Sequence, residues 1–379
     1  MPSSPQISIH DRLERTIYTR ENLGKLTVAI IGCGALGSEA ARLLGLLGLR
    51  QVLLIDSDCV EATNFTHSTY LRGEAVLGRP KVEVAAEKLS AQFPETTWTP
   101  LICEIADVGF QRLRECSLIF SCTDNTLARV ETAYVAYRLQ VPIADAGLKG
   151  HAFWSGRVAW FPASSSTACY LCQLGEVRRA ELLSLSLSSS HSCSSLLPEH
   201  PILPSTPTMA SIIAGVQVDL GLRLTLATRQ EATPSEARAW ELSLPLPETT
   251  WRSFAIPQSW DCPWHDSDPS LTLTPLPMDI PLRESIAQHA HGDQLPVLEL
   301  DWPRCIRARC STCQYLWSPM VRLAILRRRM HCPSCGGVRL HSIETFSNMT
   351  VSDALARHTP KELGLPEDHL FTLRCRRDA

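Results

Sequence analysis

The sequence predicts an α/β protein built on a doubly wound parallel sheet, with a structural zinc site and a small C-terminal zinc-binding module. Three observations lead to this prediction. In the first part of the 379-residue chain, short β-branched runs alternate with segments of helical apolar spacing, which is typical of strands joined by crossover helices. A glycine-rich turn follows the first of these strands. Further along, cysteines recur in C-x-x-C pairs.

The composition is that of a globular protein with a substantial core. Apolar residues make up 44% of the chain and charged residues 20%, and the net charge is −3. A nearly neutral chain has no strong overall attraction to nucleic acid or to a membrane surface. The N-terminal segment has no apolar core of a secretory signal, and no run approaches the roughly 18 unbroken apolar residues of a spanning helix. Fifteen cysteines without a visible export signal favour metal ligation and reactive thiols, so we expect a cytoplasmic protein.

The expected secondary structure follows the apolar pattern. The expected strands are Val28–Ile31, Gln51–Ile55, Leu118–Ser121 and Val141–Asp145, and the expected helices are Ser38–Leu47, Leu127–Leu139 and Thr208–Leu224. Leu183–Ser195 is almost entirely leucine and serine without a clean period, which predicts a mobile loop. Thr233–Pro281 is rich in proline and predicts strands and loops. The tail predicts a short helix over Asp353–Arg357 and a last strand over His369–Arg374.

A glycine motif between the first strand and the first helix predicts a nucleotide site in a Rossmann-like sheet. Gly32 permits the tight turn, Gly34 lets backbone N–H groups approach phosphate, and Gly37 lets the helix pack closely on the strand. Asp56 closes the second strand, 24 residues after Gly32, where a carboxylate can accept hydrogen bonds from ribose hydroxyls. The motif alone does not distinguish NAD from ATP, and a purely structural turn is the alternative.

Three further motifs distinguish these possibilities. The segments Asp56-Ser57-Asp58-Cys59-Val60-Glu61-Ala62-Thr63-Asn64, Gly78-Arg79-Pro80-Lys81 and Thr123-Asp124-Asn125 with Arg129 follow one another in the chain. In this order, over about residues 12–225, they resemble the signatures of the E1-like superfamily, which includes the ThiF and MoeB adenylyltransferases and the ubiquitin-activating E1 enzymes. The resemblance implies an E1-like (ThiF) fold and an activating enzyme of a ubiquitin-like conjugation system, of a bacterial type. It also implies that the matching residues bind ATP, Mg²⁺ and an incoming C-terminal glycine.

The implied reaction needs residues of these kinds. When a carboxylate attacks the α-phosphorus of ATP, negative charge grows on phosphoryl oxygens, and fixed cations or a metal lower the barrier. Lys81 is the candidate cation, Asp124 the candidate Mg²⁺ ligand, and Asn64 can orient a phosphate. The alternatives are a solvated lysine at a helix end and a helix N-cap for Asp124. The full predicted nucleotide set is Gly32, Gly34, Gly37, Asp56, Asp58, Asn64, His67, Lys81, Asp124, Asn125 and Arg129.

Two details bear on the resemblance. The family usually has an arginine three residues after the asparagine, and here that position is His67, so phosphate binding depends on another residue if His67 is neutral. The family also has an N-terminal R-x-x-R element whose second arginine reaches across a dimer to the nucleotide. Arg12 and Arg15 have that spacing, so Arg15 is the candidate arginine finger of a homodimer, with a surface arginine as the alternative.

A first zinc site is predicted from two distant cysteine pairs. Cys169 and Cys172 form a zinc-knuckle pair, and in the E1-like family a second pair far downstream completes the site. Here the downstream element is Asp261-Cys262-Pro263-Trp264-His265, which adds Cys262 and His265 to give a Cys₃His set. The alternative is two unrelated pairs of free thiols.

Cys193 is the candidate nucleophile. Members of the family that form a thioester with their ubiquitin-like partner carry the acceptor cysteine in the loop before the helix that begins near Thr208, and Cys193 lies there. An acyl-adenylate is reactive enough for a modest thiolate fraction to attack it. An ordinary loop cysteine is the alternative. Four other cysteines lie in or beside strands and are expected to be buried small hydrophobes: Cys33, Cys59, Cys116 and Cys122.

A second zinc site is predicted near the C-terminus. Cys310, Cys313, Cys332 and Cys335 have the spacing C-x₂-C-x₁₈-C-x₂-C, which is a zinc-ribbon signature. Between Trp302 and Ile343 there are eight arginines and no acidic residue. Such a stretch can be a solvated face, a docking surface for an acidic protein, or a nucleic-acid site, for which few aromatics are available.

Together these features predict an adenylation domain over residues 1–285, with a crossover loop at about 173–207, and a zinc-ribbon module with a tail over 286–379. The expected activity is ATP- and Mg²⁺-dependent adenylation of the C-terminal glycine of a ubiquitin-like protein, thioester formation on Cys193, and transfer to an E2-like protein. The expected catalytic residues are Arg15, Lys81, Asp124 and Cys193, and the expected bound metals are Mg²⁺ and two structural zinc ions. The alternatives are a MoeB/ThiF-like sulfur-carrier adenylyltransferase, a non-catalytic scaffold, and an NAD-dependent oxidoreductase. No membrane contact is expected, and nucleic acid is the less favoured partner.

Overall fold

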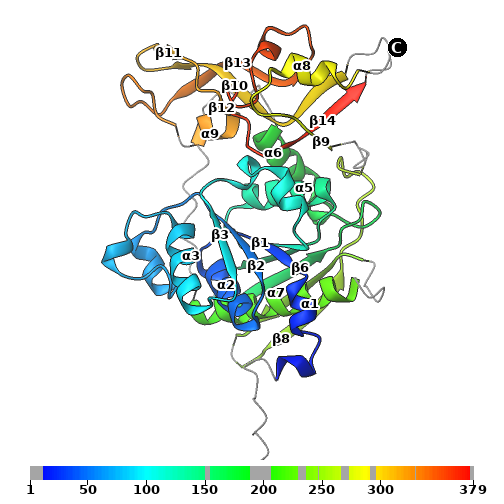
Figure 1. The fold of residues 1–379 in the computed structure, drawn as a ribbon. Coiled ribbons are helices and arrows are strands. Elements are labelled where there is room, and N and C mark those ends of the chain that lie inside the picture. The colour runs from blue at the N-terminus through cyan, green and yellow to red at the C-terminus, as the bar shows by residue number, and fades with distance from the viewer. Residues whose placement is uncertain are drawn as a thin grey trace, which may run out of the picture. The chain divides into compact units, whose positions relative to one another are not determined.

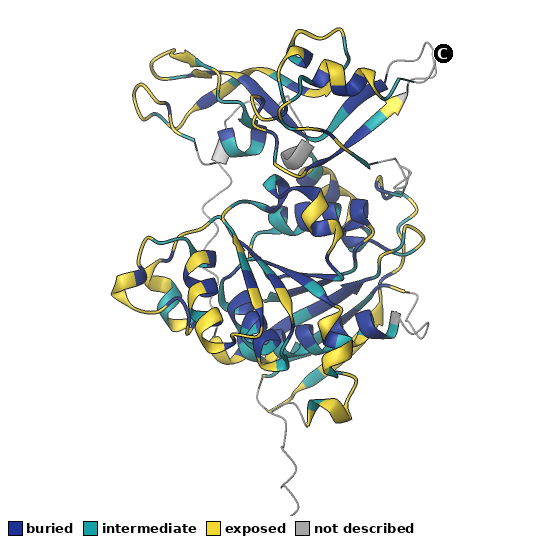
Figure 2. Cartoon of the chain, viewed as in Figure 1, coloured by how far each residue is buried: buried dark blue, intermediate teal, exposed yellow. Residues whose placement is uncertain are grey.

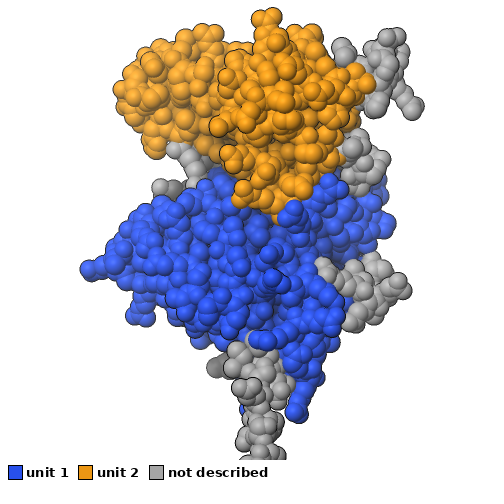
Figure 3. All heavy atoms as spheres, viewed as in Figure 1, with its two compact units in different colours: residues 1–105, 113–173, 203–266 blue, residues 106–112, 174–202, 267–379 orange. Residues whose placement is uncertain are grey.

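The computed structural model describes residues 12–149, 154–187, 206–228, 236–245, 247–265, 273–290, 296–328 and 330–375 (Figure 1). The chain groups into two compact units (Figure 3). Unit 1 comprises Met1–Ile105, Leu113–Gln173 and Leu203–Asp266, and unit 2 comprises Ala106–Arg112, Leu174–Ile202 and Ser267–Ala379. The sequence predicts a boundary at residue 285 between an adenylation domain and a zinc-ribbon module, and this boundary stays a prediction.

Unit 1 is built on an eight-stranded sheet with the order β3-β2-β1-β4-β5-β6-β7-β8. The strands are β1 Thr27–Ile31, β2 Gln51–Ile55, β3 Thr97–Leu101, β4 Leu118–Ser121, β5 Ile143–Leu148, β6 Ser155–Phe161, β7 Arg238–Ser243 and β8 Thr250–Ala255. The first five strands in this order pair in parallel, and β5 to β8 pair antiparallel. The order 3-2-1-4-5 reverses direction at β1, which is the doubly wound arrangement predicted from the sequence.

Helices cover this sheet. The helices of unit 1 are α1 Arg20–Gly24, α2 Ala35–Leu47, α3 Lys81–Gln92, α5 Thr126–Leu139 and α7 Pro207–Thr228, with short 3₁₀ turns η1 Leu13–Arg15, η2 Ala62–Thr66, η3 Glu74–Val76 and η5 Tyr170–Gln173. Helix α4 Phe110–Arg114 and the turn η4 Ile105–Asp107 are divided between the two units. The central strands are mostly buried, whereas the outer side of α3 is exposed and α2 exposes only Leu46 (Figure 2).

The long apolar helix α7 belongs to the core of unit 1. Among the described residues it is the one helix whose length and composition would suit a membrane span. However, it packs on α2 and on the strands β4, β5 and β6. Ile213, Ala214 and Leu222 are completely buried in the main apolar cluster. Its hydrophobicity is therefore accounted for by burial against the sheet.

The strands and helices predicted between Val28 and Leu224 are confirmed, with ends that differ by up to four residues from the predicted ones. Strand β5 begins at Ile143 instead of Val141. The predicted loop Leu183–Ser195 is wrong over its first residues, because α6 extends over Glu176–Leu187. The Glu-, Arg- and Ala-rich start of α6 has high helix propensity and carries the helix into the leucine–serine run. Residues 188–195 of the predicted loop lie outside the described residues.

Unit 2 contains an antiparallel six-stranded sheet with β11-β10-β14-β9 in order, and β12 and β13 also pair with β10. Its strands are β9 Leu273–Pro275, β10 Pro296–Cys310, β11 Leu316–Trp317, β12 Val321–Arg322, β13 Leu340–Met349 and β14 Leu370–Cys375, and its helices are α6, α8 Leu282–Ala287, α9 Leu323–Arg328 and the turn η6 Ala354–Arg357. The short helix and the final strand predicted for the tail are thus confirmed.

The segment Ala106–Arg112, which leads from β3 toward β4, is part of unit 2. The Phe110 side chain is completely buried there and contacts the ring of Trp302. The Asp107 carboxylate accepts a hydrogen bond of 2.8 Å from the Arg322 guanidinium. Asp107 also lies 3.8 Å from the guanidinium of Arg304. Two of the eight arginines in the predicted basic stretch are therefore buried ion-pair partners rather than parts of a solvated face.

The approach of α2 to β1 gives a direct test of the glycine-rich turn. A Cβ at Gly37 would lie 1.8 Å from the carbonyl oxygen of Gly32, whereas a Cβ at Gly34 would have no atom within 4 Å. We expect Gly37→Ala to lower the free energy of unfolding by about 3 kcal/mol or more, because backbone atoms have to move. This corresponds to a melting temperature lowered by roughly 6–12 °C in a domain of this size. Gly34→Ala should melt like the wild type. Equal melting temperatures for the two variants would contradict the packing described.

Candidate active site and metal centres

The glycine-rich turn lies at the carboxyl ends of β1 and β2. Gly32 adopts φ = +90°, which favours glycine, and its N–H donates to the carbonyl of Ile55 at 2.8 Å. Helix α2 begins directly after Gly34, and no side chain caps it. The N–H groups of its first turn thus face the carboxyl edge of the sheet without a capping side chain, an arrangement suited to an anion such as phosphate.

The Asp56 carboxylate joins the turn to the end of β2. Its Oδ2 accepts the N–H of Cys33 at 2.7 Å, and its Oδ1 accepts the N–H of Asp58 at 2.8 Å. Burial raises the pKa of Asp56, while Lys81 nearby opposes this rise. Each carboxylate oxygen has a second lone pair, so Asp56 can fix the turn and still accept a hydrogen bond from a ribose hydroxyl.

Lys81 is surrounded by carboxylates from different segments. It is the first residue of α3, and its ammonium group lies 3.2 Å from Oδ2 of Asp58. Only 12% of the Lys81 side chain is exposed. Burial lowers the pKa of Lys81, but the carboxylates of Asp56, Asp58 and Asp124 together outweigh burial and raise it. Lys81 is therefore a fixed cation at neutral pH and not the solvated helix-end lysine considered above.

Asp124 is exposed on the loop between β4 and α5. The side chain of the next residue, Asn125, caps α5 by accepting the N–H groups of Leu127 at 2.8 Å and Ala128 at 3.4 Å. The alternative that Asp124 is the helix cap is therefore wrong, because Asn125 has that position. The carboxylate of Asp124 remains at the carboxyl edge of the sheet, close enough to Lys81 to raise its pKa.

Arg129 forms hydrogen bonds that fix the loop between β4 and α5. Its guanidinium donates to both carboxylate oxygens of Asp145, at 2.8 and 2.9 Å, and also to the carbonyl of Thr123. Asp145 in turn accepts the hydroxyl of Ser121 at 2.7 Å. Arg129 was predicted as a nucleotide-binding residue, and this stays a prediction. The contacts within unit 1 indicate that it positions the carbonyl next to Asp124.

Gln217 belongs to the same support and was not singled out from the sequence. It is completely buried on α7, and its amide donates to the carbonyls of Ser121 at 3.0 Å and Ala144 at 2.9 Å. It thereby joins the ends of β4 and β5. The available signal was one glutamine within the apolar run from Ile212 to Val218. A buried amide needs partners of this kind.

Asn64 and His67 lie on and just after η2. The Oδ1 atom of Asn64 accepts the N–H of Glu61 at 2.9 Å. The Nδ1 atom of His67 lies 2.8 Å from the hydroxyl of Thr66. Their roles toward phosphate stay predictions.

Arg15 and Cys193 are the remaining predicted catalytic residues. Arg15 is exposed at the end of η1, and its role as an arginine finger stays a prediction. Cys193, the predicted nucleophile, lies outside the described residues.

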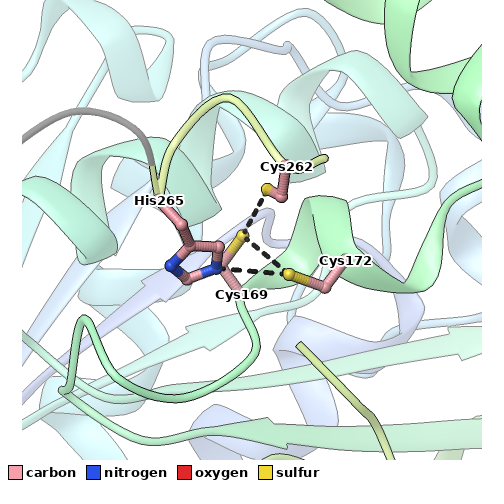
Figure 4. Close-up of side chains that lie close together, drawn as sticks. All are labelled: Cys169, Cys172, Cys262 and His265. Atoms are coloured by element: carbon pink, nitrogen blue, oxygen red, sulfur yellow. Dashed lines mark hydrogen bonds between the residues drawn. The ribbon is translucent and has the colours of Figure 1, made fainter. Parts of the chain in front are cut away.

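The first predicted metal site is assembled as the sequence suggested (Figure 4). The Sγ atom of Cys169 lies 3.7 Å from that of Cys172 and 3.6 Å from that of Cys262, and Nε2 of His265 lies 3.2 Å from Sγ of Cys172. Sulfur ligands at about 2.3 Å from a tetrahedral zinc are about 3.8 Å apart, so the set fits zinc, and these sulfurs are too far apart for a disulfide. Nδ1 of His265 lies 3.1 Å from the carbonyl of Ser165, which orients the ring.

The second predicted site also comes together. Sγ distances are 3.7 Å between Cys310 and Cys335 and 3.6 Å between Cys313 and Cys332. The two knuckles have the same backbone geometry. In one, Gln314 donates its N–H to the carbonyl of Cys310 at φ = +61°, and in the other, Gly336 donates to Cys332 at φ = +69°. The sulfur set again fits a tetrahedral zinc.

The four cysteines expected to be buried hydrophobes divide into two kinds. Cys33, Cys116 and Cys122 are buried, and burial raises the pKa of Cys116 and of Cys122 to about 12. Cys59 is exposed, so the expectation for it is wrong. It follows the end of β2 in the loop that carries Asp58, where the chain has already left the sheet.

The doubly wound sheet, the uncapped helix after a glycine-rich turn and the Cys₃His cluster are the features that the resemblance to the E1-like superfamily predicts. Residues 7–264 match the ThiF family, and this chain belongs to it.

This chain is also similar, at moderate sequence identity, to several known proteins. The chain is 32% identical to the molybdopterin-synthase adenylyltransferase of Salmonella typhimurium over 155 residues, which are 40% of this chain and 60% of that protein. It is 26% identical to ubiquitin-like modifier-activating enzyme 5 of Drosophila mojavensis over 219 residues, 54% of this chain and 52% of that protein. Thus the chain spans 60% or less of the length of these curated relatives. The crystal structure of E. coli MccB with ATP has a similar fold, with a TM-score of 0.52 and 16% identity over 70% of this chain and 77% of that chain.

The metal centres lead to a prediction about zinc content. We expect two zinc ions for each purified chain, and one zinc ion for Cys172→Ser, because its loss leaves three ligands in the first site. His265→Cys should retain both ions, since a fourth thiolate suits the same tetrahedral geometry. Cys59→Ser is the matched control, as an exposed thiol outside both clusters. Metal analysis of the protein after gel filtration measures the content. Two ions in Cys172→Ser would show that Cys172 is not needed to hold zinc, and one ion in the wild type would show that one of the two clusters holds none.

Proposed function

We propose that this protein uses ATP to adenylate the C-terminal glycine carboxylate of a ubiquitin-like or sulfur-carrier protein. The observation that carries the proposal is the position of the Lys81 ammonium group at the carboxyl edge of the sheet, beside the start of α2. It lies 3.2 Å from the Asp58 carboxylate, and Asp56 and Asp124 also raise its pKa. Its support from outside the chain is membership of the ThiF family and similarity to an adenylyltransferase and to a ubiquitin-like modifier-activating enzyme.

In the proposed reaction, an oxygen of the glycine carboxylate attacks the α-phosphorus of ATP. A new P–O bond forms, the bond from the α-phosphorus to the bridging oxygen breaks, and pyrophosphate leaves with that electron pair. The N–H groups at the start of α2 and the Lys81 ammonium group stabilise the growing negative charge. Because these groups are fixed before the substrate binds, little reorganisation is needed during the reaction.

Asp124 would hold a Mg²⁺ ion on the phosphates. Its carboxylate is exposed on a loop whose position Arg129 and Asn125 fix, and carboxylate oxygen is a preferred Mg²⁺ ligand. The bound ion would neutralise phosphate charge. In the absence of nucleotide, the charge of Asp124 contributes to holding Lys81 protonated.

We propose Cys193 as the acceptor of the activated carboxylate in a second step. Its thiolate would attack the carbonyl carbon of the acyl-adenylate, form a thioester and release AMP, and the acyl group would then pass to an E2-like protein. Similarity to a ubiquitin-like modifier-activating enzyme favours this step. Similarity to a molybdopterin-synthase adenylyltransferase favours the second candidate, in which a sulfur-carrier protein is adenylated without a thioester on this chain. In both cases Arg15 of a second copy would reach the nucleotide in a homodimer.

The adenylation step is tested by exchange of labelled pyrophosphate into ATP in the presence of the cognate carrier protein. We expect Lys81→Met and Asp124→Ala to lower the exchange rate by about 10²–10³-fold, because each removes charge stabilisation at the phosphates. Lys88→Met is the matched control, since Lys88 lies on the same helix and its ammonium group contacts the carbonyl of Arg72. A non-catalytic scaffold predicts no exchange with any carrier, and wild-type exchange in Asp124→Ala would overturn the assignment of that residue.

The second step is tested separately with Cys193→Ser. After incubation with ATP and the carrier, wild-type protein should give a covalent adduct that disappears on addition of a thiol reductant, and Cys193→Ser should give none. Pyrophosphate exchange should persist in the variant, because adenylation precedes the thiol. A reducible adduct in Cys193→Ser would refute Cys193 as acceptor, and no adduct in either protein would favour the sulfur-carrier alternative.

A further inference from the structure

The zinc-ribbon segment has a charge distribution unlike the rest of the chain. Residues 302–343 contain eight arginines, no lysine and no acidic residue, which leaves 28 basic and 39 acidic residues elsewhere. The segment is therefore strongly basic on an otherwise acidic protein. Since Arg304 and Arg322 are buried against Asp107, they account for only part of this excess.

Three other arginines lie on one exposed face of the sheet in unit 2. Along β10, Arg307 and Arg309 are exposed whereas Ala308 and Cys310 are buried, so the two arginines share the outer face of the strand. Arg339, just before β13, is also exposed. These three form no ion pair within the described part of the chain.

The same face carries apolar side chains. The register places Leu316 and His341 on either side of Arg309, so the three residues form one row across β11, β10 and β13. The register shift between Arg307 and Ala308 leaves Ile343 as an extra residue on β13. Leu316 and Ile343 are 40% and 47% exposed. We call the set Arg307, Arg309, Leu316, Arg339, His341 and Ile343 the ribbon face.

The composition of the ribbon face favours an acidic protein over a nucleic acid as its partner. Protein interfaces are enriched in arginine and depleted in lysine, and the segment uses arginine alone. The planar guanidinium group binds carboxylates in two-point contacts. Leu316 and Ile343 can bury area against an apolar side chain but contribute nothing toward a phosphate backbone.

We propose that the ribbon face docks an acidic protein surface with apolar residues at its centre. Carboxylates of the partner pair with Arg309 and Arg339, while Leu316 and Ile343 cover the apolar centre. This binding site is separate from the residues proposed for adenylation and needs no nucleotide.

The proposal is tested with fluorescent probes and the full-length protein without ATP. The first probe is a synthetic peptide that alternates glutamate with leucine and phenylalanine, the second replaces each glutamate by lysine, and the third is a single-stranded oligothymidine. We expect the acidic peptide to bind and the lysine peptide not to bind. Arg309→Glu with Arg339→Glu should weaken binding of the acidic peptide at least about tenfold, and Leu316→Ser should weaken it at constant charge.

Arg357→Glu is the matched control, because Arg357 is an exposed arginine on η6, outside the ribbon face. Arg309→Gln with Arg339→Gln removes the charges more gently if the reversed variant does not fold, and a zinc content equal to the wild type verifies the ribbon. Equal affinity of the double variant and the wild type for the acidic peptide would overturn the proposal. Tighter binding of oligothymidine than of the acidic peptide would also overturn it and would assign the face to nucleic acid.

Discussion

The balance of charge around Lys81 is the constraint on which the nucleotide half of the protein depends. Burial lowers the pKa of this ammonium group, and carboxylates from three segments outweigh that effect: Asp56 at the end of β2, Asp58 in the loop after it, and Asp124 after β4. Those segments are neighbours in space because β1 lies between β2 and β4 in the sheet. The order of the strands thus brings these carboxylates near Lys81. A bound phosphate would replace them as the negative charge next to the ammonium group.

The loop that carries Asp124 shows how support is distributed over the fold. Arg129 holds the carbonyl of Thr123, Asn125 caps the helix that follows, and Gln217 joins β4 to β5 beneath the loop. These are backbone-directed bonds from buried or half-buried side chains, and such bonds are worth most where water is excluded. The exposed carboxylate therefore sits on a loop that is fixed at both ends.

Much of this arrangement could be predicted from the sequence. The features that could not be predicted depend on a choice between adjacent residues, on contacts between distant segments, or on burial. The glycine-rich turn, Lys81 and the two cysteine clusters depend on residue type and spacing within short segments, which a sequence displays directly. Asn125 could not be separated from Asp124 as the cap, because both residues favour that position. The pairing of Asp107 with Arg304 and Arg322 joins residues about two hundred positions apart and has no local signature. The exposed Cys59 shows that adjacency to a strand is a poor guide to burial.

The segment Ala106–Arg112 gives unit 2 an unusual relation to the chain. Unit 2 takes one of its buried aromatic side chains, Phe110, from the connection between β3 and β4, and the N–H of Gln111 in the same segment donates to the carbonyl of Asp368. A domain that is connected to the rest of a protein at one point in the sequence can be gained, lost or exchanged by recombination at that point. Unit 2 takes the segment Ala106–Arg112 from within the sequence of unit 1, so recombination at a single point near residue 267 would transfer unit 2 without this segment.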